Sequence, residues 1–102
     1  MIFQKPIVFE WDKGNSDKNW SKHGIKNEEA EEAFFDEKKK IAKDVFHSGK
    51  EKRWILLGKT KNNMLLFIVF TVRNNIIRIV SARKINKKEA HLYEKKAYYS
   101  II

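Results

Sequence analysis

The sequence predicts a small α+β domain, in which helices pack on one face of an antiparallel sheet made of a four-stranded meander and a short N-terminal strand. Its length of 102 residues is that of one domain, and a hydrophobic share of 42% is enough for one core. The second half contains four strand-length apolar segments separated by turn sequences, and stretches with helical spacing lie on both sides of it. We therefore expect a single domain over residues 1–102.

The first elements are a short strand and a short helix. Apolar residues alternate over 6–11, which predicts a strand with Ile7 and Trp11 on one side. Turn residues follow, and Asn15 or Ser16 can cap a helix over 17–23. The helix is expected to end at the glycine that comes next.

Two further helices are indicated by capping residues. Asn27 is expected to cap the second helix, which has carboxylates in its first turn, an apolar stripe and an end near Asp36. Asn86 is expected to cap the last helix, over 87–98, with Ala90, Tyr93 and Ala97 along one face. We expect the helices to cover one face of the sheet and to leave the other free.

Between these helices the sequence predicts a meander of four antiparallel strands. The segments rich in Ile, Val, Leu and Phe are 40–46, 52–59, 64–72 and 76–83. Asparagine pairs at 62–63 and 74–75 are typical of tight hairpins with left-handed backbone. The segment 64–70 is apolar on both faces, so we place its strand at the centre of the sheet.

Charge is distributed unevenly along the chain. The formal net charge is +9, made up of −1 in residues 1–51 and +10 in residues 52–102. All four arginines lie in the second half: Arg53, Arg73, Arg78 and Arg83. This asymmetry favours a polyanionic partner, most simply nucleic acid. The alternative is a basic protein that surface lysines keep soluble.

Other features exclude several classes of protein. The chain has no cysteine, so disulfides, thiolate metal sites and cysteine nucleophiles are excluded. It has no apolar stretch of membrane-spanning length and no secretion signal, which predicts a cytoplasmic protein with no membrane partner. Nucleotide-binding and metal-binding motifs are absent, and three scattered histidines argue against a metal site. We therefore expect no cofactor.

Charged residues within and before the strands are the candidates for chemistry. Arg78 lies among apolar residues of the last strand, and strict alternation puts it on the face opposite Ser81 and Arg83 unless a bulge intervenes. The alternative is that one arginine forms an ion pair within the chain and the other is solvated. His47, Glu51 and Arg53 are suited to general acid/base work on a phosphodiester, although such a run is also common on edge strands.

The 2′-hydroxyl of RNA is an internal nucleophile, so an enzyme without metal needs only a base, an acid and cations at the phosphate. His23 also carries an ionisable ring, but it directly precedes a glycine at a helix end, where a capping role is the simpler interpretation.

Several blocks of the sequence together suggest a family. The central ones are Lys22-His23-Gly24, His47-Ser48 with Glu51 and Arg53, and Ile77-Arg78 with Ser81-Ala82-Arg83. Around them stand Phe9-Glu10-Trp11-Asp12, Phe70-Thr71-Val72-Arg73, and Glu89 with Tyr93. Taken in the order of the chain, from about residue 7 to residue 96, these blocks resemble the motifs of BrnT-type toxins. The chain departs at Lys13-Gly14, where relatives often have proline after the aspartate.

The resemblance implies a RelE-like ribonuclease toxin of a type II toxin–antitoxin pair. Such a toxin cleaves RNA without metal and arrests translation. Its implied partner is a BrnA-like ribbon-helix-helix antitoxin, which forms a hetero-oligomer with the toxin and binds operator DNA. The resemblance also implies that Lys22 and His23 have a functional role and do not only cap a helix. The polar motif positions are Lys22, His23, His47, Glu51, Arg53, Thr71, Arg73, Arg78, Ser81 and Arg83.

From these we select catalytic and RNA-binding candidates. Glu51 is the first choice for general base and His47 for general acid, with His23 as an alternative acid. Arg53, Arg78 and Arg83 are candidates for stabilising the transition state, and Lys22, Thr71, Arg73 and Ser81 for binding RNA. Two alternatives stay open: a nucleic-acid-binding module that does not cut, and a protein-interaction subunit with an acidic partner.

Overall fold

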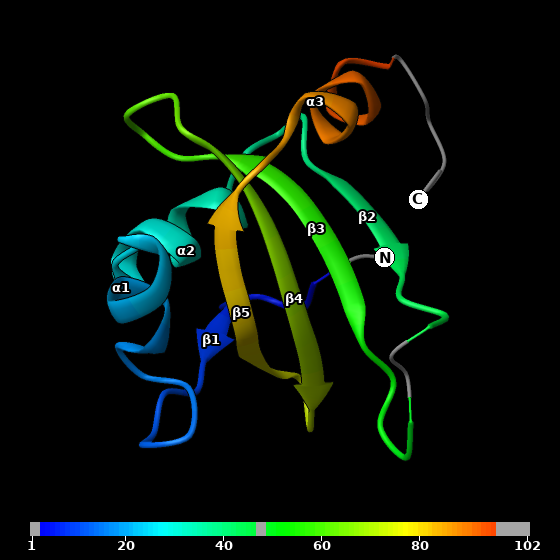
Figure 1. The fold of residues 1–102 in the computed structure, drawn as a ribbon. Coiled ribbons are helices and arrows are strands. Elements are labelled where there is room, and N and C mark those ends of the chain that lie inside the picture. Colours follow the sequence, from blue (N-terminus) through cyan, green and yellow to red (C-terminus); the bar gives the residue numbers. More distant parts are fainter. Residues whose placement is uncertain (1–2, 47–48, 96–102) are drawn as a thin grey trace.

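The structure is a computed structural model, and it describes residues 3–46 and 49–95 (Figure 1). It is an α+β fold, as predicted, with five strands and three helices over these residues. The elements are β1 (Val8–Phe9), α1 (Lys18–His23), α2 (Asn27–Ala33), β2 (Lys40–Lys43), β3 (Trp54–Lys59), β4 (Leu65–Arg73), β5 (Ile76–Lys84) and α3 (Lys87–Glu94). None of these helices is long and apolar enough to cross a membrane.

The strands form one mixed sheet in the order β1-β5-β4-β3-β2. Strands β2 to β5 are the predicted antiparallel meander, with β4 at the centre. The expectation of an antiparallel sheet is wrong for β1, which pairs with β5 in parallel through Val8↔Ile76 and Phe9↔Ile77. Side-chain alternation is the same in both kinds of ladder, so the sequence pattern does not encode strand direction.

The asparagine hairpins take the backbone conformation that their sequence indicates. Asn74 and Asn75 have φ of 51° and 65°, and Arg73↔Ile76 is the closing pair of the β4–β5 hairpin. Positive φ at both central residues is the signature of a type I′ turn. Asn63, with φ of 62°, makes a left-handed turn between β3 and β4.

Helices α1 and α2 cover one face of the sheet, and the main core lies between them and the strands. Phe34, at the end of α2, packs edge-on against Phe70 of β4, with ring centroids 5.1 Å apart. Gly58 of β3 allows this close approach, because a Cβ there would stand 2.4 Å from the carbonyl oxygen of Ala33. The buried core residues are Ile25, Ala30, Ala33, Phe34, Leu56, Leu66, Ile68, Phe70, Ile77, Ile79 and Ala82.

Helix α3 lies on the opposite face of the sheet, so the expectation that all helices share one face is wrong. Tyr93 of α3 is 8% exposed and packs with Ile55 and Leu57 of β3. Its hydroxyl donates to Oδ2 of Asp36, 2.5 Å away, and this contact ties α3 to the turn after α2. The sheet face opposite α1 and α2, which α3 covers only at one end, is called the open face below.

The caps are only partly as predicted. Asn86 caps α3 by accepting from the N–H of Glu89, but the helix ends at Glu94, before the expected residue 98. Ala97 lies outside the described residues. Asn27 is the first residue of α2 and not its cap, since its side chain donates to Ser16 and accepts from the backbone of Asp17.

Candidate active site on the open face of the sheet

A β-bulge in β5 brings its polar residues onto the open face. Val69 pairs with Ser81 and Phe70 with Ile79, so Val80 is an extra residue in β5. The alternation of side chains changes there. Strict alternation, which separated Arg78 from Arg83, is therefore wrong: Arg78 lies opposite Thr71, and Arg83 opposite Phe67 on the same face.

Arg78 is held in place by two carboxylates from the β1–α1 segment. Its Nη1 and Nη2 donate to the two oxygens of Asp12 at 2.7 and 2.9 Å, and Nη1 also donates to Glu10 at 3.1 Å. The hydrogen bonds from Arg78 lower the pKa of Asp12 to about 2. A guanidinium has five N–H groups. Within the described residues three are used, which leaves the Nε–H and one Nη2–H as a free edge.

The loop that carries Asp12 is fixed by Asn15, which the sequence suggested as a helix cap and which instead bonds to the loop and to β5. Its side chain is 2% exposed, accepts from the N–H of Asp12 and donates to the carbonyls of Glu10 and Ile79. Gly14 completes the loop, because a Cβ there would lie 2.9 Å from Nη2 of Arg78. Asp12 is the last residue of the Phe9-Glu10-Trp11-Asp12 motif. The sequence did not indicate that Asp12 pairs with Arg78, because the two residues are 66 positions apart.

Glu51 and Arg73 form a second, bidentate ion pair nearby. Nε and Nη2 of Arg73 donate to the two carboxylate oxygens of Glu51 at 2.6 and 2.8 Å. These bonds, together with the charges of Arg53 and Arg78, lower the pKa of Glu51. Glu51 is therefore ionised at neutral pH, and three arginines lie close enough to act on it.

Thr71 lies in the middle of this group. It is 2% exposed, and its hydroxyl has no hydrogen-bond partner among the residues that the structure describes. Arg78 is its cross-strand neighbour in β5. Arg53 directly precedes β3. Because side chains alternate along a strand, Arg53 points to the same face of the sheet as Ile55, which is the open face. We call Arg53, Arg73 and Arg78, with Thr71 between them, the arginine cluster.

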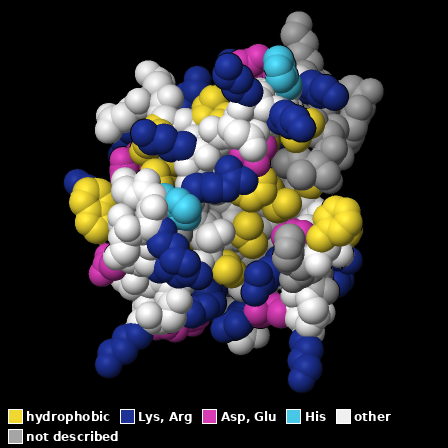
Figure 2. All heavy atoms as spheres, in the orientation of Figure 1, with side chains coloured by type: hydrophobic (Ala, Val, Ile, Leu, Met, Phe, Trp, Pro, Cys, Tyr) yellow, Lys and Arg dark blue, Asp and Glu magenta, His cyan; other side chains and the backbone are white. Residues whose placement is uncertain are grey.

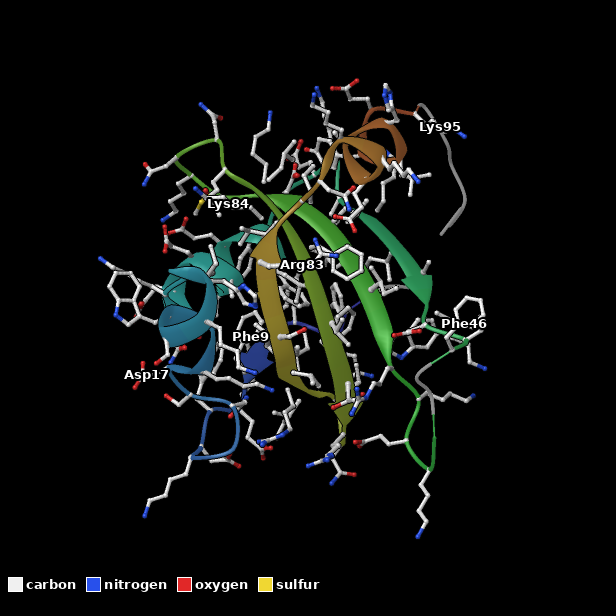
Figure 3. The ribbon with its side chains drawn as sticks, viewed as in Figure 1. Phe9, Asp17, Phe46, Arg83, Lys84 and Lys95 are labelled. Atoms are coloured by element: carbon white, nitrogen blue, oxygen red, sulfur yellow. The ribbon has the colours of Figure 1, made fainter. Side chains whose placement is uncertain are left out.

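Arg83 is further along the open face (Figure 3). Its guanidinium carbon lies 4.2 Å from the ring centroid of Phe67, and Nη1 and Nη2 donate to the carboxylate of Glu89 at 2.9 and 2.7 Å. Glu89 raises the pKa of Arg83 and fixes the plane of its side chain. Ser81 lies on the same face, opposite Val69.

The remaining candidates do not join the arginine cluster. Lys22 and His23 are exposed at the end of α1, and no hydrogen bond or ion pair within the described residues connects them to an arginine. His47 lies outside the described residues. In residues 3–46 and 49–95 no group of three histidine or acidic side chains could hold a metal ion.

The open face therefore combines an apolar floor with basic groups. Figure 2 shows Lys and Arg side chains around an apolar patch on the face in view. Three of the arginines are oriented by carboxylates, with their pKa raised by Glu51, Asp12 and Glu89 respectively. Of these, Arg73 and Arg78 are close to the Thr71 hydroxyl, which has no partner among the described residues, and such a group of donors is chemically suited to a phosphate or another polyatomic anion.

Fold and site thus define a small α+β protein whose open sheet face carries arginines bound by carboxylates. Residues 11–89 match the family described as ribonuclease toxin, BrnT, of type II toxin–antitoxin systems. The chain belongs to this family, as its sequence motifs indicated, and membership implies an RNA target and an antitoxin partner. No curated protein matches the chain.

Proposed function

We propose that this toxin is a metal-independent endoribonuclease whose active site is the arginine cluster on the open face. It cleaves RNA in the cytoplasm by attack of the 2′-hydroxyl on the adjacent phosphate, and so arrests translation. The observation that supports this most strongly is the buried hydroxyl of Thr71, which lies among three arginines and has no hydrogen-bond partner in residues 3–46 and 49–95. An unsatisfied buried donor is costly in the free protein, and an RNA phosphate would satisfy it.

The arginines would bind the reacting phosphate. The free edge of Arg78 matches two oxygens of a phosphate, and the carboxylates of Asp12 and Glu10 hold the guanidinium in that orientation. When the 2′-oxygen attacks phosphorus, negative charge builds up on the non-bridging oxygens. A fixed guanidinium stabilises that charge without having to reorient.

Proton transfer is assigned to Glu51 and His47. Both oxygens of Glu51 are bound by Arg73 in the free protein. If Arg73 turns to the RNA phosphate, the carboxylate is released, its pKa rises, and it can take the proton of the 2′-hydroxyl. His47, four residues earlier in the sequence, gives a proton to the departing 5′-oxygen, and His23 is the alternative acid. The products are a 2′,3′-cyclic phosphate and a 5′-hydroxyl end.

The remaining candidates would hold the RNA strand. Arg53 and Arg73 contact phosphates beside the reacting one, and Thr71 donates its hydroxyl. Ser81 and Arg83 continue the surface along β5. Lys22 is at the exposed end of α1 and would contact the strand beyond the sheet.

Neutralisation would require a protein that masks the open face. We propose a BrnA-like ribbon-helix-helix antitoxin, which forms a hetero-oligomer with the toxin and binds operator DNA through its own domain. A neighbouring reading frame for a small ribbon-helix-helix protein is the simplest supporting observation.

The test is cleavage of a defined RNA by purified protein in excess EDTA. We expect cutting with cyclic-phosphate ends, and no cutting where a 2′-deoxy nucleotide replaces the reacting one. In cells, the Glu51→Ala/Arg78→Ala double variant should not arrest growth. Steep, salt-dependent RNA binding without any cleavage would instead identify a non-catalytic binding module. Full toxicity of the folded double variant would exclude this site.

A further inference from the structure

A second basic site lies at the end of the open face away from the arginine cluster. It is a pocket of about 470 Å³ between α3 and strands β2 and β3, here called the lysine pocket. Lys40 pairs across from Leu57, and Lys59 follows Leu57 by two residues, so both side chains are on the open face. The pocket is lined by Lys38, Lys40, Lys59, Tyr93, Glu94 and Lys95.

Two of these lysines converge on one fixed ring. The Nζ atoms of Lys40 and Lys59 lie 5.9 and 6.0 Å from the centroid of Tyr93. Tyr93 is held by its hydrogen bond to Asp36 and by its packing on β3. The ring thus positions both ammonium groups at the pocket.

Across the described part of the chain, no salt bridge involves any of the four lysines. The charge of Lys59 does act on Asp36 and helps to lower the pKa of that carboxyl. The acids near them are Glu94, which is exposed, and Asp36, whose carboxylate accepts from Tyr93 and from two backbone N–H groups. Like charges in a shared pocket repel, and a bound anion relieves the repulsion.

We propose that the lysine pocket binds a backbone phosphate of the same RNA strand that is cut at the arginine cluster. This rests on the proposed function for the identity of the strand. Lys59 is six residues beyond Arg53, which places the two sites roughly 20 Å apart along β3. Phe67 is paired with Leu57 of β3 and Arg83 with Phe67, so this pair lies between the two sites. The substrate is then unpaired RNA several nucleotides long, held at two separated phosphates.

Binding of oligonucleotides that cannot be cut tests this directly. Fully 2′-O-methylated RNA lacks the nucleophile, so fluorescence anisotropy at several salt concentrations reports affinity alone. For the Lys40→Gln/Lys59→Gln variant we expect affinity for an octanucleotide to fall about tenfold. We expect its salt slope to decrease by about 1, and affinity for a dinucleotide to stay the same.

The matched control is Lys43→Gln/Lys61→Gln, which removes the same charge outside the lysine pocket. Lys43 pairs with Trp54 and so points to the face of α1 and α2, and Lys61 is in the β3–β4 hairpin. It should leave octanucleotide binding nearly unchanged, and Lys40→Arg/Lys59→Arg should restore it. Thermal unfolding confirms that each variant is folded.

Three results would overturn the proposal: an equal loss in the control, no loss in the lysine-pocket variant, or an effect confined to binding an acidic peptide. If wild-type protein binds the octanucleotide through the lysine pocket but cuts no RNA, the proposed catalytic function fails and the second phosphate site stands.

Discussion

Replacing Thr71 by valine is predicted to make the protein more stable and less active. The hydroxyl of Thr71 is buried without a partner in the described structure. Leaving such a group unsatisfied costs roughly 1–3 kcal/mol. Valine has the same branched shape and no polar atom, so we expect Thr71→Val to raise the free energy of unfolding by about 1 kcal/mol. For a domain of this size that corresponds to a rise in Tm of roughly 4–8 °C.

The same substitution removes a donor from the RNA phosphate. A hydrogen bond to a charged group contributes roughly 1.5–3 kcal/mol, so cleavage or RNA affinity should fall about 10- to 100-fold. Urea unfolding measures the first effect, and single-turnover cleavage with a binding titration measures the second.

Thr60 provides the matched control. It is also buried, at 4% exposed, but its hydroxyl accepts from the backbone N–H of Met64 at 3.1 Å. Thr60→Val should therefore lower the free energy of unfolding by about 1 kcal/mol and leave RNA cleavage unchanged. If Thr71→Val is destabilising to the same degree, the hydroxyl of Thr71 has a partner in the folded protein, and the reasoning for a phosphate site at Thr71 fails.

Three further changes test the structure around the site. Asp12→Asn should lower stability above pH 4. Because Arg78 lowers the pKa of Asp12 from 3.8 to about 2, thermal unfolding should show this difference shrinking as the pH falls through that range. Gly58→Ala should cost about 2–3 kcal/mol in urea unfolding, since its Cβ would meet a carbonyl of α2, and an unchanged stability would contradict the packing described. Tyr93→Phe should cost about 1 kcal/mol by losing its bond to Asp36, and a neutral result would show that this contact does not anchor α3.

Strands and hairpins could be predicted because their signals are local. Runs of Ile, Val, Leu and Phe bounded by asparagine pairs specify β3, β4 and β5 almost to the residue. The side of the sheet on which α3 packs could not be predicted, because an apolar stripe containing Tyr93 fits either face. The parallel direction of β1 was missed because alternation does not encode direction.

The sequence indicated which residues make up the candidate site, but it did not indicate how they are arranged in space. The four arginines on or beside strands could be identified from charge and sequence pattern. The bulge at Val80, which puts Arg78 and Arg83 on the same face, could not, because no glycine or proline marks it in the sequence. The carboxylates that orient the arginines were also missed. Asp12 and Arg78 are 66 residues apart, and only the folded chain shows that they pair.

The rate of RNA cleavage by Arg78→Gln tests most directly whether the arginine cluster is the active site. Single-turnover cleavage of one defined RNA in EDTA would be compared between wild type, Arg78→Gln and the Lys43→Gln/Lys61→Gln control, each shown to be folded. If the arginine cluster is the active site, Arg78→Gln should lower the rate by about 100-fold or more, because one oriented donor is lost from the transition state. The control should cut at nearly the wild-type rate. Equal rates for Arg78→Gln and wild type would contradict the assignment of cleavage to this face.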